Sequence, residues 1–177
     1  LGFETTRTLC LAIAMDQMLK EKQTAVFSEF SYQAWQHTRQ MAAIARTLAK
    51  RIGRLSPEDA LLGGLLDQLG AFYLLYRAAE RPEYRNNILH TLDLLIHWHR
   101  EIGDNLLQLL ALPEKIIDAI TTPSSPVPDA ACTLNDVLNF SRHIAPTKLP
   151  WLPAPPAPMD SPAFAQFHAI HDEAEAE

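Results

Sequence analysis

The feature that most constrains the fold of this chain is a spacing of apolar residues that follows the α-helix and not the β-strand. Residues three and four apart share one face of a helix, whereas a half-buried strand alternates apolar and polar residues. No segment of the chain alternates over a sustained run with β-branched residues, so the sequence predicts an all-α helical bundle. The clearest helical stripe lies within residues 31–52 and consists of Trp35, Thr38, Ala42, Ala45, Ala49 and Ile52.

Capping residues set the limits of the predicted helices. Gly53 follows the helix of residues 31–52 at the position where a left-handed residue ends a helix. Ser56 is the predicted N-cap of the next helix, Pro57 suits its first turn, and Asp59 stands where a capping-box acid belongs. This helix is expected to run through the sequence GGLLDQLG, residues 63–70, and a further helix to follow from residue 70 to about 79.

The other predicted helices are residues 5–22, 82–110, 113–120, 129–145 and one that starts at 161–162. The first should bury Leu9, Ile13 and Met18, and the helix of residues 82–110 should be broken or bent between 97 and 103. Paired glycines inside a helix let another helix approach closely, and we expect this role for Gly63 and Gly64.

The proline distribution divides the chain near its C-terminal end. Only Pro57 and Pro82 of the thirteen prolines precede residue 112. Residues 146–160 are too rich in proline to be helical, and we expect an extended strap that Trp151 anchors to the bundle. A ligand for a proline-recognition domain is the less favoured interpretation of this segment. Residues 161–177 are predicted to form a helix followed by an acidic tail.

Composition and charge narrow the classes of partner. A net charge of −6 at pH 7 gives no attraction to a phosphate backbone, so neither nucleic acid nor an anionic membrane is an expected partner. The longest uninterrupted apolar run, residues 9–15, is far too short to span a bilayer. Cys10 and Cys132 lie in apolar helical surroundings, which indicates buried free thiols and a cytoplasmic location.

Polar residues set among apolar ones are the candidates for a functional site, because the chain has neither a glycine-rich phosphate loop nor a nucleophile elbow. His97 and His99 are two residues apart and point in different directions on a helix, so together they cannot form a two-histidine metal face. The candidates are His37, Asp67, Gln68, His97, His99, Asp136, Asn139 and His143.

Three segments that contain five of these eight candidates resemble the HDOD family, a bacterial signalling branch of the HD phosphohydrolase superfamily. They are WQHTRQMAAIARTLAKRIG at residues 35–53, SPEDALLGGLLDQLG at 56–70 and HWHREIGDNLLQLLALPEKIIDAI at 97–120, and LGFETTRTL at 1–9 is similar as well. The resemblance implies an HD-type helical bundle over residues 1–145. HDOD domains carry further helices upstream, and the chain begins with Leu1, so an N-terminal part is expected to be missing.

The resemblance also implies which residues correspond to the metal site of the superfamily. There a histidine, a His-Asp pair and a distant aspartate bind divalent metals that activate water against a phosphate ester. His37 matches the first histidine, and Asp67-Gln68 stands in place of the His-Asp pair. The final acid matches either Asp136 or Asn139.

Two departures from the metal-binding pattern favour a lost reactive centre. Gln68 is neutral and a poor replacement for a metal-bridging carboxylate. His99 matches a histidine of metal-competent relatives, but residues 121–124 replace the later His-His pair that those relatives use. In place of a metal, an ion pair or hydrogen bond between His37 and Asp67 is expected, which would raise the pKa of His37 and lower that of Asp67.

The sequence and the resemblance together predict a regulatory module of bacterial signal transduction that is not an enzyme and needs no metal or cofactor. A partner protein in a signalling pathway is expected, and the vestigial pocket leaves room for a small-molecule ligand. Two alternatives stay open. One is a metal-dependent phosphohydrolase with an altered ligand set, and the other is a sensor that binds a small ligand or nucleotide in the vestigial pocket.

Overall fold

The computed structural model describes residues 24–110, 112–123, 133–153 and 162–175, together with positions 6, 10, 13, 14 and 17. Within this part of the chain all regular structure is helical and no strand occurs, which confirms the predicted all-α class. In chain order the elements are η1 (Thr24–Phe27), α2 (Ser28–Ile52), α3 (Pro57–Leu66), α4 (Leu69–Ala79), α5 (Pro82–Arg85), α6 (Ile88–Leu109), α7 (Glu114–Thr121), α8 (Leu134–Ile144) and α9 (Pro162–Glu175).

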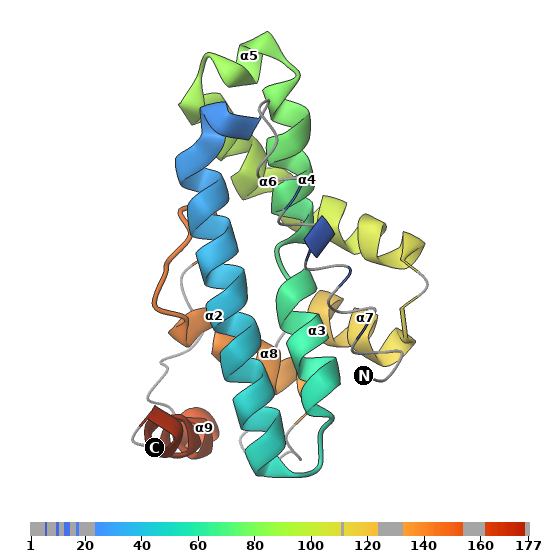
Figure 1. The fold of residues 1–177 in the computed structure, drawn as a ribbon, viewed down its shortest axis with the longest axis vertical. Helices are drawn as coiled ribbons and strands as arrows, with labels where there is room; N and C mark the ends of the chain where they lie inside the picture. The colour runs from blue at the N-terminus through green and yellow to red at the C-terminus, as the bar shows by residue number, and fades with distance from the viewer. Residues whose placement is uncertain are drawn as a thin grey trace.

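Helix α2 runs along the length of the bundle, and α3 and α4 follow one another beside it (Figure 1). As predicted, α2 ends before Gly53, whose φ of 72° is left-handed. The expected close approach is confirmed at Gly64, where a Cβ atom would lie 2.5 Å from the Cα atom of Ala42 in α2. At Gly63 a Cβ atom would lie 2.8 Å from the Leu138 side chain of α8. The two glycines therefore let α3 pack tightly against two helices at once.

Helix α3 begins as predicted and ends earlier than predicted. The Ser56 hydroxyl accepts a hydrogen bond from the Asp59 backbone N–H at 3.1 Å, whereas the Asp59 carboxylate pairs with Lys115 of α7. The prediction that one helix continues through residues 63–70 is wrong, because α3 ends at Leu66 and α4 starts at Leu69. Asp67 and Gln68 thus occupy a junction, where partners from distant segments hold their side chains.

Helices α4 and α6 cross with their backbones in close contact. A Cβ atom at Gly70 would lie 1.9 Å from the His99 carbonyl oxygen and 2.6 Å from the Gly103 nitrogen. The predicted break between residues 97 and 103 is absent, since α6 is continuous there, and Gly103 serves this crossing. The break lies before α6 instead, where the Asn87 side chain accepts hydrogen bonds from two backbone N–H groups, at 3.1 and 3.3 Å.

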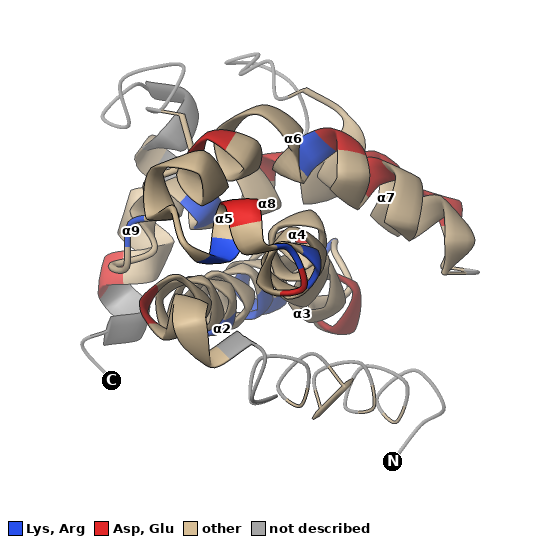
Figure 2. Cartoon of the chain, turned by 90° about the horizontal axis from the view of Figure 1, so that it is seen from above, with Lys and Arg blue, Asp and Glu red and all other residues tan. Residues whose placement is uncertain are grey.

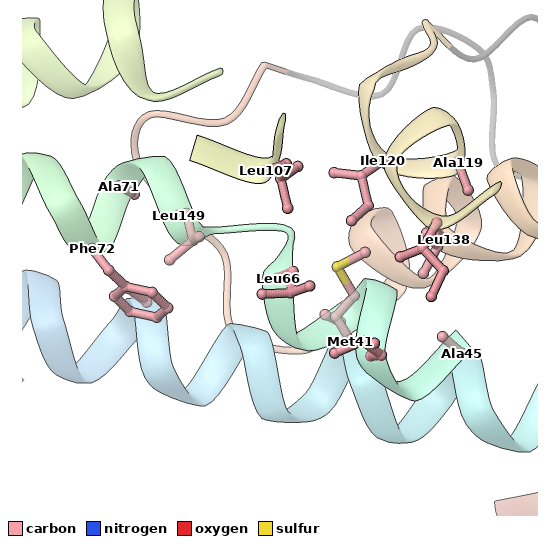
Figure 3. Close-up of a cluster of buried hydrophobic side chains, with 14 of the residues drawn as sticks. Met41, Ala45, Leu66, Ala71, Phe72, Leu107, Ala119, Ile120, Leu138 and Leu149 are labelled. Atoms are coloured by element: carbon pink, nitrogen blue, oxygen red, sulfur yellow. The ribbon is translucent and has the colours of Figure 1, made fainter. Parts of the chain in front are cut away.

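The core lies where α2, α3, α4, α6, α7 and α8 meet, and the strap closes one side of it (Figure 3). Trp151 is 2% exposed and meets Phe30 of α2 edge to face at a centroid distance of 5.7 Å. This confirms Trp151 as the anchor of the strap within residues 146–153, and residues 154–160 lie outside the described part. Side chains that illustrate the core in Figure 3 are Met41, Leu66, Leu107, Ile120 and Leu138.

Two burial predictions for the N-terminal segment are wrong. Ile13 is 56% exposed and Cys10 is exposed, although both positions are helical. Helical periodicity identifies an apolar face, but burial also requires an element that packs on it. Leu9, Met18 and Cys132 lie outside the described residues.

Acidic and basic residues both occur on several of the described helices, as the colours in Figure 2 show. Within the described residues no helix is both long enough and apolar enough to cross a bilayer.

Candidate functional site

The centre of the candidate site is an ion pair between Asp67, at the junction of α3 and α4, and Arg142 of α8. The Arg142 Nε atom donates to the two carboxylate oxygens at 3.1 and 3.2 Å, and Nη2 donates to Oδ1 at 2.5 Å. The side chains of Arg142 and Asp67 are only 13% and 3% exposed. Burial by itself raises the pKa of Asp67, but the charge and hydrogen bonds of Arg142 outweigh it and lower that pKa. The carboxylate is therefore ionised, and its charge is neutralised inside the protein.

Gln68 extends this pair into a chain of hydrogen bonds that reaches the strap. Its Nε2 atom donates to Asp67 Oδ2 at 2.7 Å, and its Oε1 atom accepts from the Trp151 Nε1–H at 3.0 Å. Gln68 is 1% exposed, so both ends of its amide need partners inside the protein. At the other end of the chain, Arg142 Nη1 makes a longer contact of 3.5 Å with Asn139 Oδ1.

His37 points its Nδ1 atom at the strap and does not pair with Asp67. Nδ1 donates to the Thr147 carbonyl oxygen at 2.7 Å, and the Thr147 N–H donates to Gln40 at 2.8 Å. Burial lowers the pKa of His37, against the opposing effects of the Thr147 carbonyl and of Asp67. The predicted His37–Asp67 pair with a raised histidine pKa is therefore wrong. The predicted lowering of the Asp67 pKa is right, but its main cause is Arg142.

The structure separates the two residues that could match the final acid of the superfamily. The Asp136 carboxylate accepts hydrogen bonds from the Thr133 N–H at 2.8 Å and the Thr133 hydroxyl at 2.7 Å, and so forms a capping box at the start of α8. Asn139, one turn later, is 3% exposed and lies beside Arg142. Asp136 therefore belongs to a helix cap, and only Asn139 belongs to the pocket.

A cavity of about 640 Å³ opens beside the ion pair, between α6, α8, the end of α7 and the strap. Asp67, Gln68, His99 and Asn139 line it as predicted, whereas His37 and Asp136 do not. The lining residues that the sequence did not suggest include Arg100, Asp104, Arg142, Trp151 and Leu152.

Arg142 is the important residue that sequence reasoning missed. It stands three residues after Asn139 and therefore on the same side of a helix. A buried aspartate needs a compensating cation, so an arginine on that face is a candidate partner, but its contact with Asp67 depends on how the helices pack.

The donors at this site do not fit the divalent metal that the superfamily implies. Asp67 is already bound by a guanidinium, which would repel a metal cation at the same carboxylate. The Gln68 oxygen is neutral and accepts from Trp151. In the described part of the chain no three histidine, cysteine, aspartate or glutamate side chains are grouped so that they could hold a metal ion.

The family comparison bears on the same segments. A family model described as the HDOD domain matches residues 1–126, well over half of the 177 residues. The chain belongs to the HDOD family. It matches no curated protein and no solved structure. The matched region contains Asp67 and Gln68 and ends before α8, so Arg142 and Asn139 lie beyond it. The extension of the domain to residue 145 stays a prediction.

Proposed function

We propose that this HDOD protein is a non-catalytic regulatory module of bacterial signal transduction that acts from the cytoplasm through a partner protein. The observation that carries the proposal is the buried pair of Asp67 and Arg142. In the superfamily reaction, carboxylates hold metal ions that activate water. Here Asp67, at the position of the histidine of the His-Asp pair, holds an arginine instead, and Gln68 replaces the aspartate of that pair.

The interactions around this pair support a structural role. Asp67 accepts from Gln68 as well as Arg142, and Gln68 in turn accepts from Trp151 of the strap. The network ties the α3–α4 junction to α8 and to the C-terminal strap with its hydrogen-bonding groups engaged. A nucleophilic water would need a metal or a free base at the same place, and the Asp67 carboxylate there is already bound by Arg142 and Gln68.

The test is to measure the metal content and the phosphodiesterase activity of the chain purified without chelator. We expect well under one equivalent of manganese, iron, zinc or nickel, and no hydrolysis of bis(p-nitrophenyl) phosphate with added Mn²⁺ above a blank. Asp67→Asn and His99→Gln are the matched variants, and circular dichroism checks that both fold. Stoichiometric metal and hydrolysis that both variants lose would contradict the proposal and favour a phosphohydrolase with an altered ligand set.

A further inference from the structure

The cavity beside the Asp67–Arg142 pair has walls that are largely apolar. Its size of about 640 Å³ lies within the range of pockets that enclose small organic ligands. Helix α6, the end of α7 and the strap each contribute apolar side chains to it. These are Ile96, Leu107, Ile120, Pro150, Trp151 and Leu152.

The charges that line the cavity cancel. Asp67 is paired with Arg142, and among the described residues of the lining the other ionic side chains are Asp104 and Arg100 of α6. Arg100 also donates to the carbonyl oxygens of Ile120 and Thr121 at the end of α7. A ligand of either sign would leave water and meet charges of both signs. Burial of an ion without its own counter-charge is strongly unfavourable, so the lining favours an uncharged ligand.

The two histidines of the lining do not disturb this balance near neutral pH. Burial lowers the pKa of His99, and burial together with Arg142 lowers the pKa of His143 to about 4. Both imidazoles are therefore neutral when the surrounding solution is near neutral.

Two polar groups of the lining are available to a ligand. His99 donates from Nδ1 to the Leu95 carbonyl oxygen at 2.7 Å, which leaves Nε2 as a hydrogen-bond acceptor. Asn139 uses its Oδ1 atom toward Arg142, and its amide nitrogen makes no hydrogen bond with the described residues. One acceptor and one donor are thus present among the apolar side chains.

We propose that this cavity binds an uncharged amphiphilic small molecule, with an apolar body against the strap and α6 and a polar end that meets His99 and Asn139. The polar end would carry both a donor and an acceptor, as an amide, a lactam or a neutral heteroaromatic ring does. The inference goes beyond the proposed function and does not depend on it, because a non-catalytic partner-binding module needs no ligand.

Two fluorescent probes that differ by one charged group test the inference on the full chain. N-phenyl-1-naphthylamine is neutral, apolar and carries an N–H donor, and 8-anilino-1-naphthalenesulfonate is the same molecule with a sulfonate. We expect saturable binding of one equivalent of the neutral probe, and binding of the sulfonate about tenfold weaker or more.

Variants on one helix locate the binding. Ile96 lines the cavity and is 46% exposed, so Ile96→Trp should narrow the cavity without disturbing the core. Leu89 of the same helix is 71% exposed and lies outside the lining, so Leu89→Trp is the matched control. We expect Ile96→Trp to weaken the neutral probe about tenfold and Leu89→Trp to leave it unchanged. His99→Phe, which removes the acceptor, should weaken it about threefold to tenfold.

Each contrary outcome overturns a defined part of the inference. No saturable binding of the neutral probe, or equal binding by Ile96→Trp and the wild type, removes the cavity as a ligand site. Equal affinity for the two probes would contradict the proposal that the ligand is uncharged. An unchanged affinity of His99→Phe for the neutral probe would contradict the proposal that a polar end of the ligand meets His99. None of these results changes the metal and hydrolysis test of the proposed function, so failures of the two can be told apart.

Discussion

An acidic side chain meets a basic one both in the candidate site and on the outer face of α6, and the two pairs differ in almost everything but distance. Asp67 and Arg142 are 75 residues apart in sequence, and their side chains are 3% and 13% exposed. Asp93 and His97 are one helical turn apart with a contact of 3.2 Å, which is an ion pair only when the histidine is protonated, and their side chains are 73% and 61% exposed. The first pair is therefore buried and the second is exposed to water, although both are in close contact.

The comparison teaches that solvent, more than distance, sets the energetic importance of an ion pair. Water screens the exposed pair and solvates either partner alone, so the pair adds little to stability. The buried pair has lost that solvation, so each charge depends on the other. The buried pair also sits in a network with Gln68 and Trp151, which an exposed pair on one helix lacks.

The largest expected effect comes from breaking the buried pair. Arg142→Leu leaves the Asp67 charge buried without its partner, and we expect a loss of about 3–5 kcal/mol in the free energy of unfolding. The double variant Asp67→Asn/Arg142→Leu removes both charges and should be more stable than Arg142→Leu alone. Urea unfolding of the two variants measures both quantities.

The control for this experiment is Arg77→Leu, since Arg77 pairs with Glu80 at 2.7 Å with half of the arginine side chain exposed. It should change stability by less than about 1 kcal/mol. If Arg142→Leu behaves like Arg77→Leu, or if the double variant is less stable than Arg142→Leu, the buried charges do not depend on one another.

A smaller effect should appear in the pH dependence of stability. Burial and the charge of Arg142 lower the pKa of His143 from 6.5 to about 4, so between these pH values the unfolded chain binds a proton that the folded chain does not. Stability from a neutral His143 is thus fully present above pH 6.5 and is lost as the pH falls toward 4. Because His143 is only half-buried, we expect a loss on the order of 1 kcal/mol after solvent screening.

The measurement is urea unfolding of the wild type and His143→Asn at several pH values from 7 to 4. His143→Asn should flatten the decline in stability, and His97→Asn on the exposed face of α6 should leave it as in the wild type. Burial also lowers the pKa values of His37 and His99. Part of the decline in stability at low pH should therefore remain in both variants. Equal slopes in His143→Asn and the wild type would contradict the prediction.

The smallest effect is expected for the exposed pair itself. Asp93→Asn should change the free energy of unfolding by less than about 0.5 kcal/mol at neutral pH, because water replaces the lost contact. Thermal or urea unfolding of Asp93→Asn and Asp67→Asn under the same conditions measures the two losses in stability. A loss in Asp93→Asn as large as in Asp67→Asn would show that exposure does not separate the two pairs.

The sequence predicted those residues of the candidate site that can be aligned with a position of the family pattern. Asp67, Gln68, His99 and Asn139 line the cavity as the resemblance implied. The partner of Asp67 was not predictable in this way, because the pattern aligns residues by position and says nothing of which side chains meet. His37 was the nearest candidate in the pattern, but the strap presents a carbonyl to His37 and α8 presents Arg142 to Asp67.

What the sequence determined by itself is the set of features that depend on neighbours a few residues away. The end of α2 at Gly53 and the start of α3 at Ser56 follow from local backbone conformation and capping. Tertiary structure alone decided the break at residues 67–68 and the pairing of Asp67 with Arg142. The physical reason is that burial removes water, so a polar side chain must find its partner wherever the packed helices place one, however distant in the chain.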